Sequence, residues 1–353
     1  AENFVEILPL DSDHHLPVTI QIKAPMGIEP FNRSAHRFGA GPDIGAGMAD
    51  STPSHCARAG QMVIDMALHR AGLAHHRLAQ IRSLCGRRIG QHRERRLECV
   101  GKIARMAAPL DTAHVYEVGP GPGGLTRALL YEGAKHLTAI DPDNRAVTAL
   151  NDYLHPAYPE RLSLIEGDAL EFDEQRLGAN ETTPLLIVSN LPYNVATVLL
   201  FRWLDLIYQG APIRDMVLMF QREVAQRITA QPGTKAYGRL SILAQWLCKP
   251  EIVIDLPPEA FTPPPKVSSA VVRFNPRPEP LAPAPIEELE AIVAAAFGQR
   301  RKMLRQSLKT YTKQAGIDPA HLLDCAEIDP TARAETLTIE QFCALARAAQ
   351  TLR

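Results

Sequence analysis

The sequence is short of the features that mark several large classes of protein. Its formal net charge is only −1, so the chain as a whole is not basic, and any nucleic acid must bind a local patch. The six cysteines form no CxxC pair and have no metal-ligand spacing with histidine, which indicates reduced thiols and no metal site. No run approaches the roughly 18 apolar residues that a membrane helix needs.

The first residues also lack the marks of a targeting signal. Acids and prolines stand where a signal peptide needs a basic start followed by an apolar core. We therefore expect a cytoplasmic protein that does not engage a membrane. Its 353 residues and 46% hydrophobic content are enough for two domains with a sizeable core.

Residues 1–100 differ in composition from the rest of the chain. They hold eight of the twelve histidines and eleven arginines, but a single lysine, Lys23. Their hydrophobic periodicity is poor apart from a candidate helix over 61–79. We expect an atypical N-terminal extension that is either poorly ordered or translated in a shifted reading frame. An intact frame in the gene that matches close relatives would contradict the second hypothesis.

From residue 101 onward, strand and helix patterns alternate. This alternation predicts βαβ units and an α/β fold with a parallel sheet over 101–275. The last two strands lack a full helix between them, and we expect them to pair antiparallel at the sheet edge. The expected strands cover 114–118, 137–140, 162–165, 185–188, 216–220, 251–255 and 267–274, and helices are expected over 102–108, over 125–132 and from 144.

Residues 276–285 form a proline-rich stretch that predicts a stiff linker. Only helical patterns follow it, so we expect a small all-helical domain over 286–353. Its expected helices cover 286–297, 300–315, 319–323 and 339–352.

A glycine-rich segment, EVGPGPGG at 117–124, joins a predicted strand to a predicted helix. Glycines at 119, 121 and 123 let the backbone approach a bound ligand closely. Asp141 ends the next strand and can accept from both ribose hydroxyls, while Asp168 follows the third strand and can accept from an adenine amine. All these groups lie at the carboxyl ends of strands, which predicts a nucleotide site there.

The same glycines satisfy G-x-G-x-x-G at 119, 121 and 124, a pattern that also admits a dinucleotide. Pro120 and Pro122 argue against a dinucleotide, because they remove backbone donors that a pyrophosphate would use. S-adenosylmethionine carries no phosphate and does not need these donors, so the segment favours it as the cofactor.

The turn SNLPYN follows the strand over 185–188. The side-chain oxygen of Asn190 and the main-chain carbonyl of Leu191 can accept the two hydrogens of an exocyclic adenine amine. Held this way, the nitrogen becomes pyramidal and directs its lone pair at a methyl donor, so catalysis is mainly alignment and electrostatics.

Two aromatic residues are candidates to clamp the target base. Pro192 stiffens the turn, and Tyr193 can stack on one face of the base. Phe261, in the segment FTPPPKV, is the candidate for the opposite face. A base clamped in this way must leave its stack, which is easiest in a hairpin loop.

With these motifs the chain resembles the KsgA/RsmA family of ribosomal RNA adenine dimethyltransferases. The resemblance covers about residues 101–353. It is carried by EVGPGPGGLTRALL (117–130), SNLPYNVAT (189–197), QREVAQRI (221–228), FTPPPKVSSAVVRF (261–274) and FGQRRKMLRQSL (297–308).

The resemblance implies a Rossmann-like, seven-stranded S-adenosylmethionine methyltransferase sheet with a small helical C-terminal domain. It implies N6,N6-dimethylation of two adjacent adenosines in the hairpin loop near the 3′ end of small-subunit rRNA, on immature 30S particles, by a monomer. It also implies a cofactor site lined by Gly119, Asp141, Asp168 and Asn190. To these we add three further candidates from the glycine-rich segment, Glu117, Gly121 and Gly123.

One segment departs from the family pattern. The family has G-Q-N-F-L before its first helix, closing over the cofactor, whereas here Gly90 and Gln91 are followed by charged residues. This departure, over 92–100, puts cofactor affinity in question. It favours the alternative of a non-catalytic ribosome-assembly or transcription factor with the same fold.

Two further alternatives fit the sequence less well. A large-subunit rRNA dimethyltransferase that confers antibiotic resistance would share the fold, but the QRRKMLRQSL text argues against it. A dehydrogenase would leave the turn over 190–193 unexplained.

Basic residues at a spacing of four mark a candidate RNA-binding surface. On the helix expected over 300–315 they would form one stripe able to follow phosphates, although a solvated helix face has the same pattern. The stripe comprises Arg301, Arg305, Lys309 and Lys313, and Arg222 and Arg227 are further candidates near the acceptor site.

Overall fold

The computed structural model describes residues 98–192, 194–261 and 265–353, which all fall within one compact unit of the chain, residues 54–353. The predictions made for residues 1–97, including the reading-frame hypothesis and most of the departing segment 92–100, lie outside the described residues. The stacking role predicted for Tyr193 lies outside them as well.

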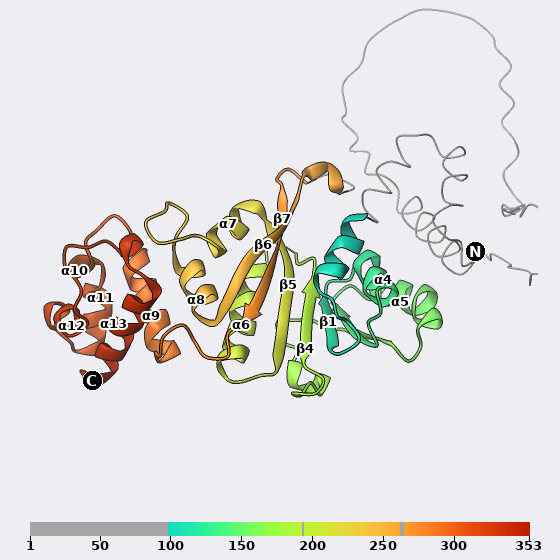
Figure 1. The fold of residues 1–353 in the computed structure, drawn as a ribbon, viewed down its shortest axis with the longest axis horizontal. Coiled ribbons are helices and arrows are strands. Elements are labelled where there is room, and N and C mark those ends of the chain that lie inside the picture. The colour runs from blue at the N-terminus through green and yellow to red at the C-terminus, as the bar shows by residue number, and fades with distance from the viewer. Residues whose placement is uncertain (1–97, 193, 262–264) are drawn as a thin grey trace, which may run out of the picture. The chain divides into compact units, whose positions relative to one another are not determined.

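A seven-stranded sheet forms the centre of the described chain (Figure 1), in the order β3-β2-β1-β4-β5-β7-β6. The first five strands run parallel, and β7 lies antiparallel between β5 and β6, so the predicted fold class and antiparallel pair are confirmed. The strands are β1 His114–Val118, β2 His136–Asp141, β3 Leu162–Glu166, β4 Leu185–Ser189, β5 Ile213–Gln221, β6 Cys248–Leu256 and β7 Ser269–Pro276.

The apolar strand sequences follow from burial of the sheet on both faces. Every residue of β4 is buried, and its side chains alternate between two separate hydrophobic clusters. Leu185 and Ile187 contribute to the first cluster, and Leu186 and Val188 contribute to the second. A parallel strand covered on both faces reads as a continuous apolar run, which is why this pattern was recognisable in the sequence.

Helices cover the two faces of the sheet. One face packs against the helical residues 98–106 and against α4 and α5, and the other packs against α6 and α8. The bounds are α4 Gly124–Tyr131, α5 Asn144–Tyr153, α6 Ala196–Tyr208, α7 Arg222–Ile228 and α8 Arg239–Leu247, with 3-10 turns η1 His155–Ala157, η2 Glu174–Leu177 and η3 Pro258–Ala260. The sequence patterns had not delimited α6, α7 or α8.

The C-terminal region is helical, as predicted, and Figure 1 shows it gathered beside α8. The prediction of one continuous helix over 300–315 is wrong, because the first helix of this segment, α10, begins only at Leu304. Met303 pairs with Arg333 in an isolated β-bridge, so its backbone is extended and cannot belong to a helix. The elements are α9 Ile286–Gly298, α10 Leu304–Ser307, α11 Lys309–Ala315, α12 Pro319–Cys325, η4 Ala334–Thr336 and α13 Ile339–Thr351.

The proline-rich stretch lies along α8. The backbone N–H of Leu281 donates to the Trp246 carbonyl at 2.9 Å, and the Trp246 indole donates to the Ala282 carbonyl at 2.7 Å. The buried residues on the α6 and α8 face of the sheet form one continuous cluster with those of the C-terminal helices. Within the described part of the chain, no helix is both long and apolar enough to cross a membrane.

Candidate active site

Strands β1 and β4 stop pairing before they end, and this opens the site. Their ladder ends at the pair Tyr116 and Ile187, whereas β1 continues to pair with β2 as far as Val118 and Ile140. In place of a further ladder bond, the Ser189 hydroxyl donates to the Val118 carbonyl at 2.5 Å. The strand order reverses between β1 and β4, which is where open α/β sheets bind their ligands.

The glycine-rich segment leaves β1 at this point in a conformation that suits glycine. Gly119, Gly121 and Gly123 have φ values of 68°, 51° and 76°, all left-handed. A β-carbon on Gly123 would lie 2.4 Å from Leu150 Cδ2, so this glycine also permits close packing of the loop on α5. A β-carbon on Gly121 would meet open space.

The acceptor turn touches this glycine loop. A β-carbon on Gly119 would lie 3.5 Å from Pro192 Cδ, so these two residues lie close together, and the Ser189–Val118 hydrogen bond joins the two motifs that the sequence predicted separately. The Leu191 side chain is buried and anchors the turn, while Asn190 is exposed. The Pro192 carbonyl accepts from the N–H groups of Val195 and Ala196, both at 3.1 Å, which leads the turn directly into α6.

Two carboxylates lie at the ends of neighbouring strands. Asp141, at the end of β2, is 9% exposed, and its two oxygens accept from Gly121 N at 3.2 Å and Asp143 N at 2.9 Å. Asp168, after β3, is exposed, and its Oδ1 accepts from Leu170 N at 2.9 Å. Backbone bonds therefore hold both carboxylates in place, and their oxygens retain capacity to accept from a ligand.

Glu117 is a buried acid directly before the glycine loop. Its side chain is 1% exposed, and Oε2 has no hydrogen-bond partner among the described residues. The pKa of this carboxyl is raised to about 8: burial is the largest cause, hydrogen bonds from Thr126 oppose the rise, and the nearby Asp141 charge adds to it. An unpartnered buried carboxylate oxygen is costly on its own and is suited to receive a cationic group.

The remaining sequence candidates lie on other elements. Phe261 is half-buried after η3 and packs against the second hydrophobic cluster. Arg222 and Arg227 lie on α7, which follows β5, and Arg222 Nε is 3.2 Å from Asp255 Oδ1. Of the basic stripe, Arg301 lies in the turn before α10, while its other three members lie on α10 and α11.

The sequence patterns missed two residues beside this site. Ser189 bonds to Val118, but a serine at a strand end is too common to single out. Arg202 lies within the apolar helix α6 and contacts the loop that carries Asp168. A single arginine in a largely apolar helix was a signal that could have indicated it. The described residues contain no histidine, cysteine or acid cluster able to hold a metal ion.

Comparisons with known proteins agree with this geometry. A family model described as ribosomal RNA adenine dimethylase matches residues 86–351. The ribosomal RNA small subunit methyltransferase A of Rhodospirillum rubrum is 52% identical over 262 residues, covering 74% of this chain and 87% of that protein. The protein of the same name from Paracoccus denitrificans is 54% identical over 263 residues, covering 74% and 90%.

Two solved structures share the fold. A dimethyladenosine transferase from Plasmodium falciparum has a TM-score of 0.56 at 25% identity and covers 70% of this chain and 93% of its own. The 23S rRNA methyltransferase ErmE has a TM-score of 0.52 at 25% identity and covers 72% and 97%.

The sheet with its glycine loop and acceptor turn is therefore that of a Rossmann-like methyltransferase. Within that class, the chain belongs to the ribosomal RNA adenine dimethylase family. The family match begins at residue 86, so it includes the segment 92–100 whose residues depart from the family pattern.

The glycine geometry predicts unequal effects of two alanine substitutions. Gly121→Ala introduces only left-handed strain, and we expect it to lower the free energy of unfolding by about 1 kcal/mol. Gly123→Ala adds a clash with Leu150, and we expect a loss of roughly 2–4 kcal/mol. Urea denaturation of both variants measures the difference, and equal losses would contradict the packing described for Gly123.

The raised pKa of Glu117 predicts a pH dependence of stability. The folded protein holds this proton more tightly than the unfolded chain, so the associated stability is present below about pH 4.5 and is lost as pH rises through about 8. We expect Glu117→Gln to flatten the decline in unfolding free energy across that range, by roughly 5 kcal/mol at most. The exposed Glu160→Gln is the control and should leave the slope unchanged.

Proposed function

We propose that this protein transfers methyl groups from S-adenosylmethionine to N6 of two adjacent adenosines in the 3′-terminal hairpin loop of small-subunit rRNA. The observation that carries the proposal is the close approach of the glycine loop to the acceptor turn, joined by the Ser189–Val118 hydrogen bond and with Gly119 beside Pro192. A cofactor loop and an adenine-gripping turn side by side are what direct methyl transfer requires.

The choice of small-subunit rRNA rests on the relatives. The two bacterial proteins at 52% and 54% identity are named for the small subunit, whereas the large-subunit enzyme ErmE is 25% identical. All these names are those of methyltransferases, which favours the enzyme over a non-catalytic assembly or transcription factor. We further propose that the enzyme acts in the cytoplasm as a monomer on immature 30S particles and contributes to small-subunit biogenesis.

The residues present fit S-adenosylmethionine. The left-handed glycine loop lets a ligand approach the backbone, and Asp141 can accept from the ribose hydroxyls. The unpartnered oxygen of Glu117 suits the ammonium of the methionine part, and Asp168 suits the adenine amine. The proposed cofactor-binding residues are Glu117, Gly119, Gly121, Gly123, Asp141, Asp168 and Asn190.

The chain contributes positioning more than acid–base chemistry. When bound, S-adenosylmethionine supplies an electrophilic methyl group on a sulfonium. The Asn190 side-chain oxygen and the Leu191 carbonyl accept from N6 of the target adenine and orient its lone pair. The buried Leu191 side chain, the Ser189–Val118 hydrogen bond and the bonds from α6 to the Pro192 carbonyl fix the position of these acceptors. Tyr193 and Phe261 are the proposed clamps on the two faces of the base.

Asn190→Ala tests this mechanism. Loss of one of two acceptors should lower kcat by roughly 10²–10³-fold, because the N6 lone pair is no longer oriented. Asn190 is exposed, so the folded structure should survive, as circular dichroism and thermal unfolding would show. The assay measures transfer of labelled methyl groups to purified immature small subunits.

Asn194→Ala is the matched control, because this exposed amide lies in the same turn. It should retain methylation within about twofold. Methylation by Asn190→Ala at the wild-type rate would eliminate the acceptor mechanism, even if S-adenosylmethionine still binds.

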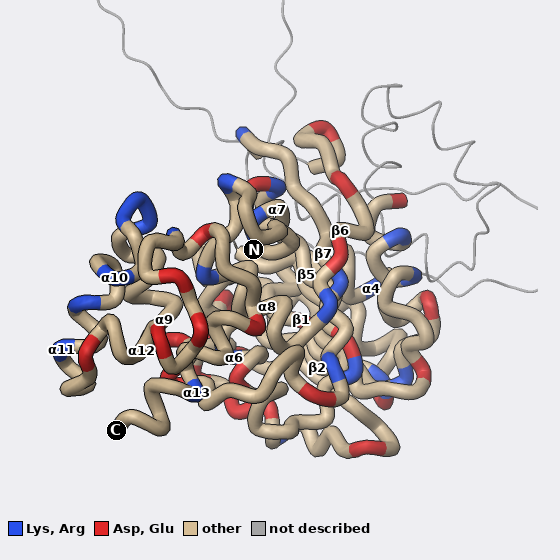
Figure 2. The backbone as a smooth tube through the Cα atoms, turned by 60° about the vertical axis from the view of Figure 1, so that its left-hand side comes forward, with Lys and Arg blue, Asp and Glu red and all other residues tan. Residues whose placement is uncertain are grey.

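The RNA surface that we propose includes α7 and the helices α10 and α11. Figure 2 shows Lys and Arg segments along these elements. An open groove of about 490 Å³ between α7, α8 and the end of α9 is lined by four cations and a single acid, Glu223. Its cations are Arg227, Lys235, Arg239 and Arg300. Such a lining suits an RNA backbone, with Arg222, Arg301, Arg305, Lys309 and Lys313 as the further proposed contacts.

Substitutions in the stripe test this surface through salt dependence. Arg305→Ala and Lys309→Ala should each weaken binding to the small subunit and reduce the slope of log affinity against log salt by about 1, as expected for one lost phosphate contact. Lys135→Ala is the control. This exposed lysine lies just before β2, at the amino ends of the parallel strands, whereas the acceptor turn lies at their carboxyl ends. Unchanged slopes in the stripe variants would remove α10 and α11 from the RNA surface.

A further inference from the structure

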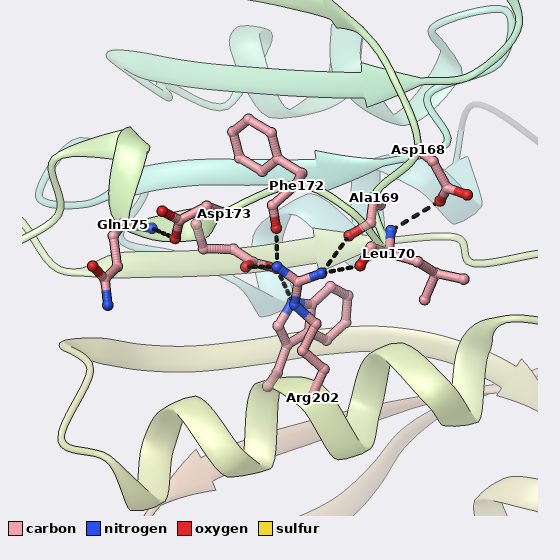
Figure 3. A network of polar contacts seen from close by, with 9 residues as sticks. Asp168, Ala169, Leu170, Phe172, Asp173, Gln175 and Arg202 are labelled. Carbon is pink, nitrogen blue, oxygen red and sulfur yellow. Dashed lines mark hydrogen bonds and ion pairs between the residues drawn. The ribbon is translucent and has the colours of Figure 1, made fainter.

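Arg202 forms hydrogen bonds with several backbone carbonyls of the loop that follows β3. From α6 its guanidinium donates to the carbonyl of Ala169 at 3.1 Å and to those of Leu170 and Phe172. It also pairs with Glu174 Oε2 at 2.8 Å (Figure 3), and Glu174 Oε1 accepts from the Trp203 indole at 2.9 Å. The Arg202 side chain is 28% exposed and that of Glu174 is 4% exposed, so the cluster is largely shielded from water.

The same contacts reach the carboxylate of Asp168 in two steps. Arg202 donates to the carbonyl of Ala169, which belongs to the same peptide unit as the N–H of Leu170, and that N–H donates to Asp168 Oδ1 at 2.9 Å. Figure 3 shows Asp168 at one end of this bonded loop. The guanidinium therefore fixes the peptide that in turn orients the Asp168 side chain.

Arginine is suited to this task in a way that lysine is not. Its planar guanidinium has five N–H donors in a fixed arrangement, and here it serves three carbonyls and one carboxylate at once. An ammonium is a point donor and cannot span the same acceptors. Holding a ligand loop in its bound conformation before binding removes part of the ordering cost of binding.

We propose that Arg202 is a positioning residue for cofactor recognition, holding the 169–174 loop so that Asp168 is presented to the adenine amine. The inference rests on the proposed function, in which Asp168 accepts from that amine. Arg202 touches neither reacting atom, so its effect falls on selection of the adenine rather than on methyl transfer itself.

The double variant R202M/E174Q removes the guanidinium without leaving Glu174 as an unpaired buried charge. Calorimetry then compares S-adenosylhomocysteine with S-inosylhomocysteine, whose hypoxanthine lacks the exocyclic amine. The wild type should prefer the adenine ligand by about tenfold or more. The variant should lose most of that preference, as we also expect of Asp168→Ala, while kcat at saturating S-adenosylmethionine stays within about twofold.

Arg176→Met is the matched control, because Arg176 lies over the Phe172 ring of the same loop, with 6.0 Å from its guanidinium to the ring centroid. It should keep the full adenine preference. A folded double variant that also keeps this preference would overturn the proposal and leave Arg202 a purely structural residue.

R202K decides the question if the double variant does not fold. The three donors of an ammonium all leave one nitrogen and cannot reproduce the bonds made by the two separate Nη atoms of Arg202, so the adenine preference should fall at least about threefold, and an unchanged preference overturns the proposal. Failure of the wild type to bind S-adenosylhomocysteine at all would instead contradict the proposed function. The two failures are therefore distinguishable.

Discussion

The separation of β1 from β4 beyond Tyr116 and Ile187 is the constraint on which the site depends. If two parallel strands stay paired to their ends, the loops that follow them start side by side and leave little room for a ligand between them. Here β1 and β4 separate before their ends, and the hydrogen bond from the Ser189 hydroxyl to the Val118 carbonyl fixes the distance between the two strand ends. The glycine loop then leaves the end of β1 and the acceptor turn leaves the end of β4, with Gly119 close to Pro192.

Because the sheet is buried on both faces, charged groups at the ends of β1 and β4 are costly to accommodate. The strands are apolar almost to their ends, so acids there are either held by backbone N–H groups, as Asp141 is, or left without a partner, as Glu117 Oε2 is. The raised pKa of Glu117 is the cost of that burial. A cationic ligand group beside Oε2 would offset the same cost, so the burial that destabilises the charged form of Glu117 also favours binding of a cation there.

Much of the fold was predictable because the relevant signals are local. The buried strands have continuous apolar sequences, Asp141 is the last residue of β2, and Asp168 follows the end of β3 by two residues. The missed features depend on partners far away in the chain. The helix expected from residue 300 starts at Leu304 because Met303 pairs with Arg333, and Arg202 acquires its role from carbonyls about thirty residues earlier. No window around Met303 or Arg202 contains that information.

Helix α6 joins two parts of the site that the sequence presents as separate motifs. Its first turn accepts the chain from the Asn190–Pro192 segment, and Arg202, further along the helix, bonds the loop after β3. The two loops therefore share one rigid support and cannot drift independently during evolution. A chimera that contains the acceptor turn of another methyltransferase would also need that protein's α6 and its loop after β3. Replacing the turn alone would shift α6 and so displace the loop that Arg202 holds.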